Sequence, residues 1–164
     1  MVNYMLMITA KLENLTDLQP QGGCDDPNLN YFFKLKCERC GEMTPKEACL
    51  NLNDMVFRGK GSTNLVKKCK FCLREGTVTM ITGRGRPLTQ IQSQFGHFTP
   101  LMVFDCKGFE PLDFSFSSDW EADSIEGTRF DGINLSRGEF VDYDEKGDCP
   151  VMISNLRAIF RVVK

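Results

Sequence analysis

The chain has 164 residues, of which 41% are hydrophobic and 26% are charged, and its formal net charge is −2. This composition is ordinary for a globular domain and excludes a disordered or collagen-like chain. The slight net acidity argues against a dedicated nucleic-acid binder. No apolar run approaches the roughly 18 residues of a membrane-spanning helix, and the first residues lack the basic segment of a secretory signal. We therefore expect a cytoplasmic protein, with the nucleus as a second compartment.

Alternation of apolar and polar residues with a period of two dominates the chain and predicts β-strands. The strands predicted in this way cover residues 4–12, 33–37, 78–81, 101–106, 114–116 and 151–163. The one helix predicted is a short turn over 44–49, because Thr44 precedes a proline and Glu47 occupies the capping-box position. The chain is thus expected to be all-β, with antiparallel sheets in a sandwich or pseudo-barrel and at most one or two short helices.

A weak internal repeat relates residues 10–18 to residues 106–114, because each is a strand that leaves into an acidic, leucine-containing turn. We therefore expect a single compact domain over 1–164 built from two related halves. The half over about 1–100 would carry the metal site described next, and the half over about 101–164 would lack one.

Two Cys-x-x-Cys pairs are the most specific feature of the chain. They are Cys37 with Cys40 and Cys69 with Cys72. Two such turns supply four thiolates, which is the tetrahedral ligand set of closed structural zinc sites, so one structural Zn²⁺ is predicted. Basic side chains flank these thiols and favour the metal-binding thiolate; they are Lys34, Lys36, Arg39, Lys67, Lys68 and Lys70. Gly41 permits the positive φ that turns backbone N–H groups toward sulfur.

Other interpretations of these motifs are weaker. Thiol–disulfide exchange needs one Cys-x-x-Cys pair on a thioredoxin-like βαβ pattern, which the chain lacks. Residues 84–87 (Arg-Gly-Arg-Pro) resemble a minor-groove hook, but their flanks are not basic, and a hairpin loop is the simpler prediction. Residues 59–62 (Gly-Lys-Gly-Ser) lack the residue order of a phosphate-binding loop, so a tight turn is expected there.

Charge is distributed unevenly along the chain. Residues 34–70 contain nine basic and four acidic side chains, whereas residues 105–148 contain thirteen acidic and four basic ones. Such polarity can steer a charged partner or hold two halves of a fold together.

The remaining candidate residues have ordinary structural explanations. Four further cysteines are expected to be unpaired, buried or half-buried thiols in a reducing compartment, namely Cys24, Cys49, Cys106 and Cys149. His97 is the only histidine, and a hydrogen-bonded or half-exposed imidazole is expected rather than a catalytic one. Three acids without the register of a calcium loop are expected to be solvated turn residues, namely Asp142, Asp144 and Glu145. Four aromatic residues are expected to pack in or beside the core, namely Phe109, Phe114, Phe116 and Trp120.

The chain resembles the eukaryotic CXXC-motif-containing zinc-binding protein family almost end to end. The resemblance rests on four blocks taken together, at residues 33–42, 59–72, 104–114 and 142–146. The chain departs from the family in the loops over 21–30 and 83–94. The resemblance implies an all-β fold of two related antiparallel halves and a zinc ion at the four cysteines. It carries over no catalytic activity, and it implies an association with copper-chaperone-type domains.

The expected function is therefore that of a non-catalytic zinc protein, whose structural four-cysteine site supports a protein-interaction or metal-handling surface. A zinc-ribbon-like nucleic-acid binder and a thiol redox protein are the alternatives.

Overall fold

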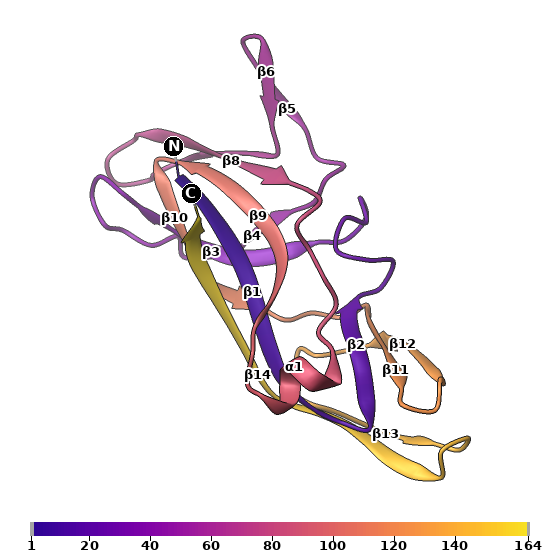
Figure 1. Ribbon diagram of the computed structural model, residues 1–164. Helices are drawn as coiled ribbons and strands as arrows, with labels where there is room; N and C mark the ends of the chain where they lie inside the picture. The colour runs from indigo at the N-terminus through magenta and orange to yellow at the C-terminus, as the bar shows by residue number, and fades with distance from the viewer. Residues whose placement is uncertain (1, 164) are drawn as a thin grey trace.

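The computed structural model describes residues 2–163, and nearly all of its regular structure is antiparallel β-sheet (Figure 1). The all-β prediction is confirmed. The strands are β1 (Val2–Glu13), β2 (Leu15–Pro20), β3 (Tyr31–Cys37), β4 (Ala48–Leu50), β5 (Val56–Arg58), β6 (Gly61–Thr63), β7 (Leu65–Lys68), β8 (Glu75–Ile81), β9 (Thr99–Lys107), β10 (Phe109–Ser115), β11 (Trp120–Ser124), β12 (Arg129–Ile133), β13 (Phe140–Asp144) and β14 (Cys149–Val163). A short helix, α1 (Gln90–Gln94), precedes β9. No helix within residues 2–163 has the length and apolarity needed to cross a membrane.

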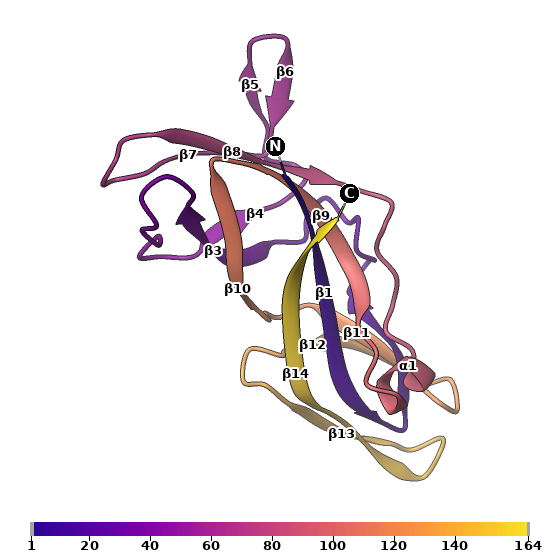
Figure 2. The same cartoon turned by 60° about the vertical axis from the view of Figure 1, so that its left-hand side comes forward.

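The strand order of the first half of the chain corresponds to that of the second half. The six-stranded sheet runs β13-β14-β1-β9-β8-β7, and this order is preserved if β1 is exchanged with β9, β8 with β14 and β7 with β13. In the same way, β2 corresponds to β10, β3 to β11 and β4 to β12. The three-stranded sheet β10-β3-β4 therefore corresponds to the sheet β2-β11-β12. The β5–β6 hairpin is outside this correspondence and projects from the body of the molecule (Figures 1 and 2).

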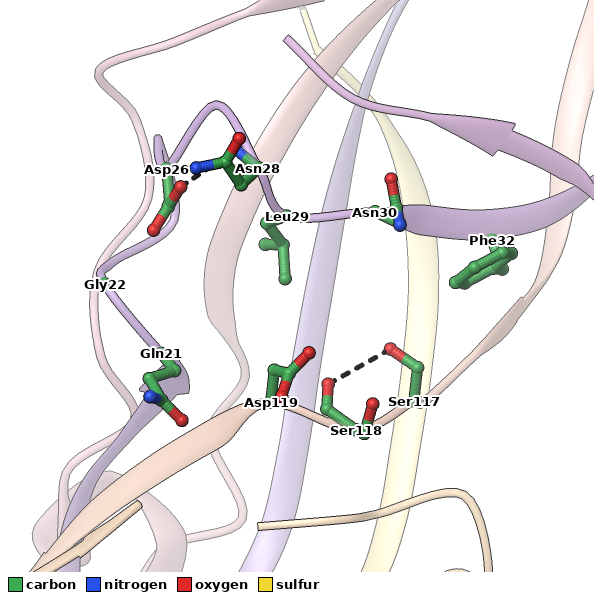
Figure 3. A pocket seen from close by; sticks show the side chains of 10 residues that line it. All are labelled: Gln21, Gly22, Asp26, Asn28, Leu29, Asn30, Phe32, Ser117, Ser118 and Asp119. Carbon is green, nitrogen blue, oxygen red and sulfur yellow. Dashed lines mark hydrogen bonds between the residues drawn. The ribbon is translucent and has the colours of Figure 1, made fainter. Parts of the chain in front are cut away.

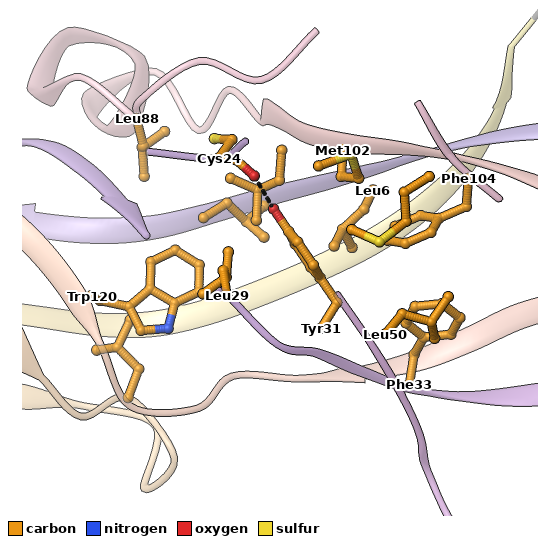
Figure 4. Packing of buried hydrophobic residues seen from close by; sticks show 14 of the residues in the cluster. Leu6, Cys24, Leu29, Tyr31, Phe33, Leu50, Leu88, Met102, Phe104 and Trp120 are labelled. Carbon is orange, nitrogen blue, oxygen red and sulfur yellow. Dashed lines mark hydrogen bonds between the residues drawn. The ribbon is translucent and has the colours of Figure 1, made fainter. Parts of the chain in front are cut away.

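The core lies between the six-stranded sheet and β3. Phe33 from β3 packs edge-on against Phe104 of β9 and Phe160 of β14, with ring centroids 4.9 and 5.2 Å apart. Tyr31 packs beside them, and its buried hydroxyl donates to the carbonyl of Cys24 at 2.9 Å (Figure 4). Edge-to-face aromatic packing of this kind stabilises the core beyond the area it buries.

The alternation along β3 determines how the first cysteine is placed. Tyr31, Phe33, Leu35 and Cys37 are buried, and the residues between them face outward. Cys37 is therefore the last inward-facing residue of a core strand, so one sulfur of the first pair is anchored to the core.

The helix predicted over 44–49 is wrong, because Thr44 bonds to β3 instead. Its N–H donates to the carbonyl of Leu35 at 2.8 Å, and its hydroxyl accepts from the N–H of Leu35 at 3.1 Å. Ala48–Leu50 then pairs with β3 as β4. The described helix is α1, whose N-cap Thr89 forms a capping box with Gln92. That Thr-x-x-Gln capping signal is present in the sequence.

Candidate metal centre

The four cysteine sulfurs of the two Cys-x-x-Cys pairs meet at one point. All four lie within 4.8 Å of one another. The sulfurs of Cys37 and Cys72 are 3.6 Å apart, and those of Cys40 and Cys69 are 3.5 Å apart. A tetrahedral zinc centre with Zn–S bonds of ~2.3 Å separates its sulfurs by ~3.8 Å. The sulfurs are therefore close to the separation that a single zinc ion requires.

Both Cys-x-x-Cys turns have the same backbone construction. Gly41 donates to the carbonyl of Cys37 at 2.9 Å, and Leu73 donates to the carbonyl of Cys69 at 3.0 Å. Each donor follows the second cysteine of its pair and has a positive φ, 79° for Gly41 and 63° for Leu73. This construction turns successive N–H groups toward the first sulfur of each pair. The positive φ expected at Gly41 is present.

These N–H groups favour thiolates at the first cysteine of each pair. The N–H groups of Cys72 and Phe71 lower the pKa of Cys69 to about 6, and the N–H of Cys40 is the main cause that lowers the pKa of Cys37. Although the N–H of Glu42 acts in the opposite sense, burial and the sulfurs of Cys69 and Cys37 raise the pKa of Cys40 to about 12. Without a cation, four anionic sulfurs this close repel one another. The donor set therefore fits a divalent, thiophilic ion.

Burial divides the four cysteines into inner and outer ligand positions. Cys37 and Cys69 are buried against the core, Cys72 is half-buried and Cys40 is exposed. The loop after β3 and the loop between β7 and β8 meet at one end of the molecule (Figure 2). A metal ion here would join two loops that the strands alone leave unconnected.

In the second half of the chain, a carboxylate lies near the position that corresponds to the metal centre of the first half. By the correspondence of strands, the turn between β13 and β14 matches that between β7 and β8, which places Asp144 next to the position that matches Cys69. The hydroxyl of Thr128 donates to Asp144 Oδ1 at 2.6 Å, and the N–H of Lys146 donates to the same atom at 3.1 Å. Hydrogen bonds from the side chains of Thr128 and Ser124 lower the pKa of Asp144.

Asp144 is 1% exposed, so the prediction of a solvated turn residue is wrong for it. The carboxylate joins the β11–β12 turn to the β13–β14 turn by hydrogen bonds, as the four cysteines bring together the two turns of the first half. Asp142 and Glu145 are exposed, as expected.

The other cysteines are free thiols within residues 2–163. Cys24 and Cys106 are buried, and burial is the main cause that raises the pKa of each to about 12. Cys149 is half-buried, and Cys49 is exposed, contrary to the prediction for Cys49. His97 is exposed rather than half-exposed, and its backbone carbonyl accepts from the hydroxyl of Thr9 at 2.9 Å.

The remaining predicted loops and aromatic residues add no chemistry. Residues 84–87 form a connection between β8 and α1 rather than a hairpin loop, and the N–H of Arg86 is bonded to the carbonyl of Pro100 at 2.9 Å. Phe109 and Trp120 are buried, as expected. Phe114 and Phe116 pack against the core from its edge.

A hollow of about 410 Å³ is lined by none of the four cluster cysteines (Figure 3). It is lined mainly by amide, hydroxyl and carboxylate side chains, among them Gln21, Asn28, Ser118 and Asp119. Its lining holds no thiol and no imidazole. No sequence motif indicates this hollow, because its lining comes from segments far apart in the chain.

An antiparallel all-β fold with a four-cysteine cluster at one end defines a class of small proteins that could hold a metal ion by thiolates alone. Within this class, the chain belongs to the family described as "CXXC motif containing zinc binding protein, eukaryotic", whose model matches residues 5–161.

Curated relatives and solved structures agree with this assignment. The chain is 38% identical over 149 residues to the CXXC motif containing zinc binding protein of Xenopus laevis, with 89% of each chain covered. It is 35% identical over 144 residues to the protein of that name from Homo sapiens, with 86% of each chain covered. The solved structure described as "Crystal Structure of C1orf123" superimposes with a TM-score of 0.88 at 32% identity, covering 98% of this chain and 99% of that one.

Proposed function

We propose that Cys37, Cys40, Cys69 and Cys72 hold one structural Zn²⁺, and that the two loops joined by this ion present a surface for a protein partner. The observation that carries the proposal is the convergence of four sulfurs within 4.8 Å from two separate turns. Four protein ligands leave no open position for a substrate, which is the pattern of structural zinc sites. We therefore propose a protein without catalytic activity at this metal site.

The proposal assigns the ion a local role. When bound, zinc supplies the positive charge that lets four thiolates share one small volume. The chain supplies the N–H groups aimed at the sulfurs and the strands that hold the inner pair. Because these features favour retention, we propose structural binding over metal handling.

The primary test is metal content. Mass spectrometry of the native chain, together with elemental analysis, should find one zinc per wild-type chain and much less in Cys69→Ser. Cys49→Ser is the matched control, because Cys49 is an exposed thiol outside the cluster, and its zinc content should equal that of wild type. Wild-type protein from zinc-replete cells without stoichiometric metal would disprove the proposal.

The alternatives make different predictions. A nucleic-acid ribbon predicts binding to polyanions whose logarithmic affinity falls linearly with the logarithm of salt concentration. A thiol redox protein predicts cluster cysteines that react with alkylating agents while zinc stays bound. A protein-binding module predicts neither.

The partner and the compartment are also proposals. A copper-chaperone-type domain is the partner implied by the family resemblance, and affinity capture with wild type beside Cys69→Ser would test whether any partner depends on the metal centre. The cytoplasm, with the nucleus as a second site, is the proposed compartment because reduced thiols and zinc are expected there.

A further inference from the structure

A groove of about 290 Å³ lies directly beside the cysteine cluster. One wall is the loop Glu42–Pro45, which follows the first cysteine pair, and the other is the segment Lys67–Phe71, which contains Cys69. The buried ring of Phe109, from the start of β10, completes the lining. We call this feature the knuckle groove. Its two walls are the segments that the proposed zinc ion would join.

The walls of the knuckle groove combine apolar and basic side chains with one acidic side chain, Glu42. Met43 is 41% exposed and Phe71 is 69% exposed, so two large apolar side chains flank the opening. Lys67, Lys68 and Lys70 lie along the same wall as Phe71. Within residues 2–163, none of these three lysines forms an ion pair with an acidic side chain of the chain itself. Their charge is therefore available to an acidic group from another molecule.

The strand that borders the groove lies at the edge of its sheet. β7 is the last strand of the six-stranded sheet, and β8 is its only neighbour there. An edge strand presents backbone N–H and carbonyl groups without strand partners, and peptides bind such edges by adding a strand. In that mode the main chain provides hydrogen bonds, and pockets for alternate side chains provide selectivity.

We propose, building on the function proposed above, that the knuckle groove binds an extended acidic segment of a partner protein. Aspartate and glutamate side chains of the segment would face Lys67, Lys68 and Lys70. A large apolar side chain would lie between Met43 and Phe71, above Phe109. The apolar walls favour a peptide over a nucleic acid, because phosphate contacts need positive charge but no apolar cleft.

The test uses zinc-loaded full-length chain and displayed random peptides of about ten residues, the upper end of usual strand lengths. Selected peptides should be enriched in Asp and Glu together with Phe, Trp or Leu. Their affinity, measured by fluorescence anisotropy, should fall at least about tenfold for the triple variant Lys67→Glu, Lys68→Glu, Lys70→Glu. A similar loss is expected for the double variant Met43→Ser, Phe71→Ser.

The matched control reverses three exposed basic residues outside the groove, Lys11→Glu, Lys60→Glu and Arg137→Glu. This variant changes the net charge by the same amount and should bind the selected peptides as wild type does. Equal losses of peptide affinity in the control and in the groove variant would overturn the proposal, because they would indicate non-specific electrostatic attraction rather than a binding site. Selection of no common peptide, stronger binding of single-stranded DNA, or self-association through the groove would also overturn it.

Zinc content separates this proposal from the function on which it rests. If every variant keeps one zinc per chain and no acidic peptide binds, only the groove proposal fails. If the wild-type chain holds no stoichiometric zinc, the proposed function fails. Peptide selection on the metal-free chain then tests the groove proposal separately.

Discussion

Leu73 has a left-handed backbone conformation, with φ of 63°. It ends the second cysteine turn, as Gly41 ends the first. A side chain at such a φ costs roughly 1–2 kcal/mol, whereas glycine adopts it freely but loses more entropy on folding. We expect Leu73→Gly to raise the free energy of unfolding by about 0.5–1 kcal/mol. Urea denaturation of the zinc-loaded chain would measure the change.

The reciprocal substitution, Gly41→Ala, serves as the control. A Cβ at Gly41 meets no atom within 4 Å, so any loss of stability comes from the backbone alone. We expect a loss of about 1 kcal/mol. Destabilisation by both substitutions would show that the exposed Leu73 side chain stabilises the fold more than its backbone strains it.

Asp144 is the residue for which pH dependence is expected. Its pKa is lowered in the folded chain by hydrogen bonds from the side chains of Thr128 and Ser124, so its carboxylate contributes stability above the unfolded pKa of about 3.9. That contribution is lost as the pH falls through the lower, folded value. Asp144→Asn should therefore lower the thermal midpoint by several degrees near neutral pH.

The difference in midpoint between wild type and Asp144→Asn should shrink between about pH 5 and about pH 3. Acid also releases zinc from thiolates, but this affects both proteins and does not enter the difference. Asp142→Asn, which changes an exposed acid on the same strand, should leave the midpoint nearly unchanged. A difference that stays constant with pH would indicate that the Asp144 charge has no part in stability.

At the scale of elements, the cysteine turns lie at one end of the core formed by β1, β3, β9 and β14, and only Cys37 and Cys69 are buried against it. We therefore expect chelation of zinc to loosen the two turns while the core persists. Iodoacetamide should then modify Cys37, Cys40, Cys69 and Cys72 but spare Cys24 and Cys106, whose burial raises the pKa of each to about 12. Mass spectrometry of the digested chain would locate the modified thiols.

Protein unfolded in guanidinium chloride is the reference for that experiment, because all eight cysteines should react there. If chelation alone exposed Cys24 and Cys106, the metal would be required for the whole fold. Modification of the cluster before chelation would instead favour the thiol redox alternative.

The sequence predicted those elements whose signals are local. Alternation located β1, β3, β9 and β14, and the spacing of the cysteines indicated which thiols meet, although their role as ligands stays a prediction. Local signals failed where distant partners decide the structure. Thr44 has the residue pattern of a helix N-cap, but Leu35 of β3 takes both of its hydrogen-bonding groups. The sequence pattern at Asp144 is that of a surface turn residue, but hydrogen bonds from Thr128 of another strand pair and from the N–H of Lys146 make its burial favourable.

At the scale of the whole molecule, the two related halves are interleaved rather than placed side by side. β1 lies between β14 and β9, and both of these strands belong to the second half. β9 in turn lies between β1 and β8, which belong to the first. The weak repeat between residues 10–18 and 106–114 pointed to related halves, and Asp17 and Asp113, which match within it, share a left-handed φ of 56° and 54°. Interleaving could not be predicted, because it concerns pairing between segments far apart in sequence.

Interleaving predicts that neither half folds alone. A chain cut at Gly83, in the connection between β8 and α1, would leave β1 without either strand neighbour, and unpaired backbone groups in a buried strand are strongly unfavourable. Each fragment expressed separately should therefore lack the β-sheet signal in circular dichroism. Co-expressed fragments should recover it as a one-to-one complex that binds zinc, because the cut preserves every strand and all four cluster cysteines. A first fragment that folds and binds zinc by itself would show instead that the halves are independent units, and the single-domain prediction would then be wrong.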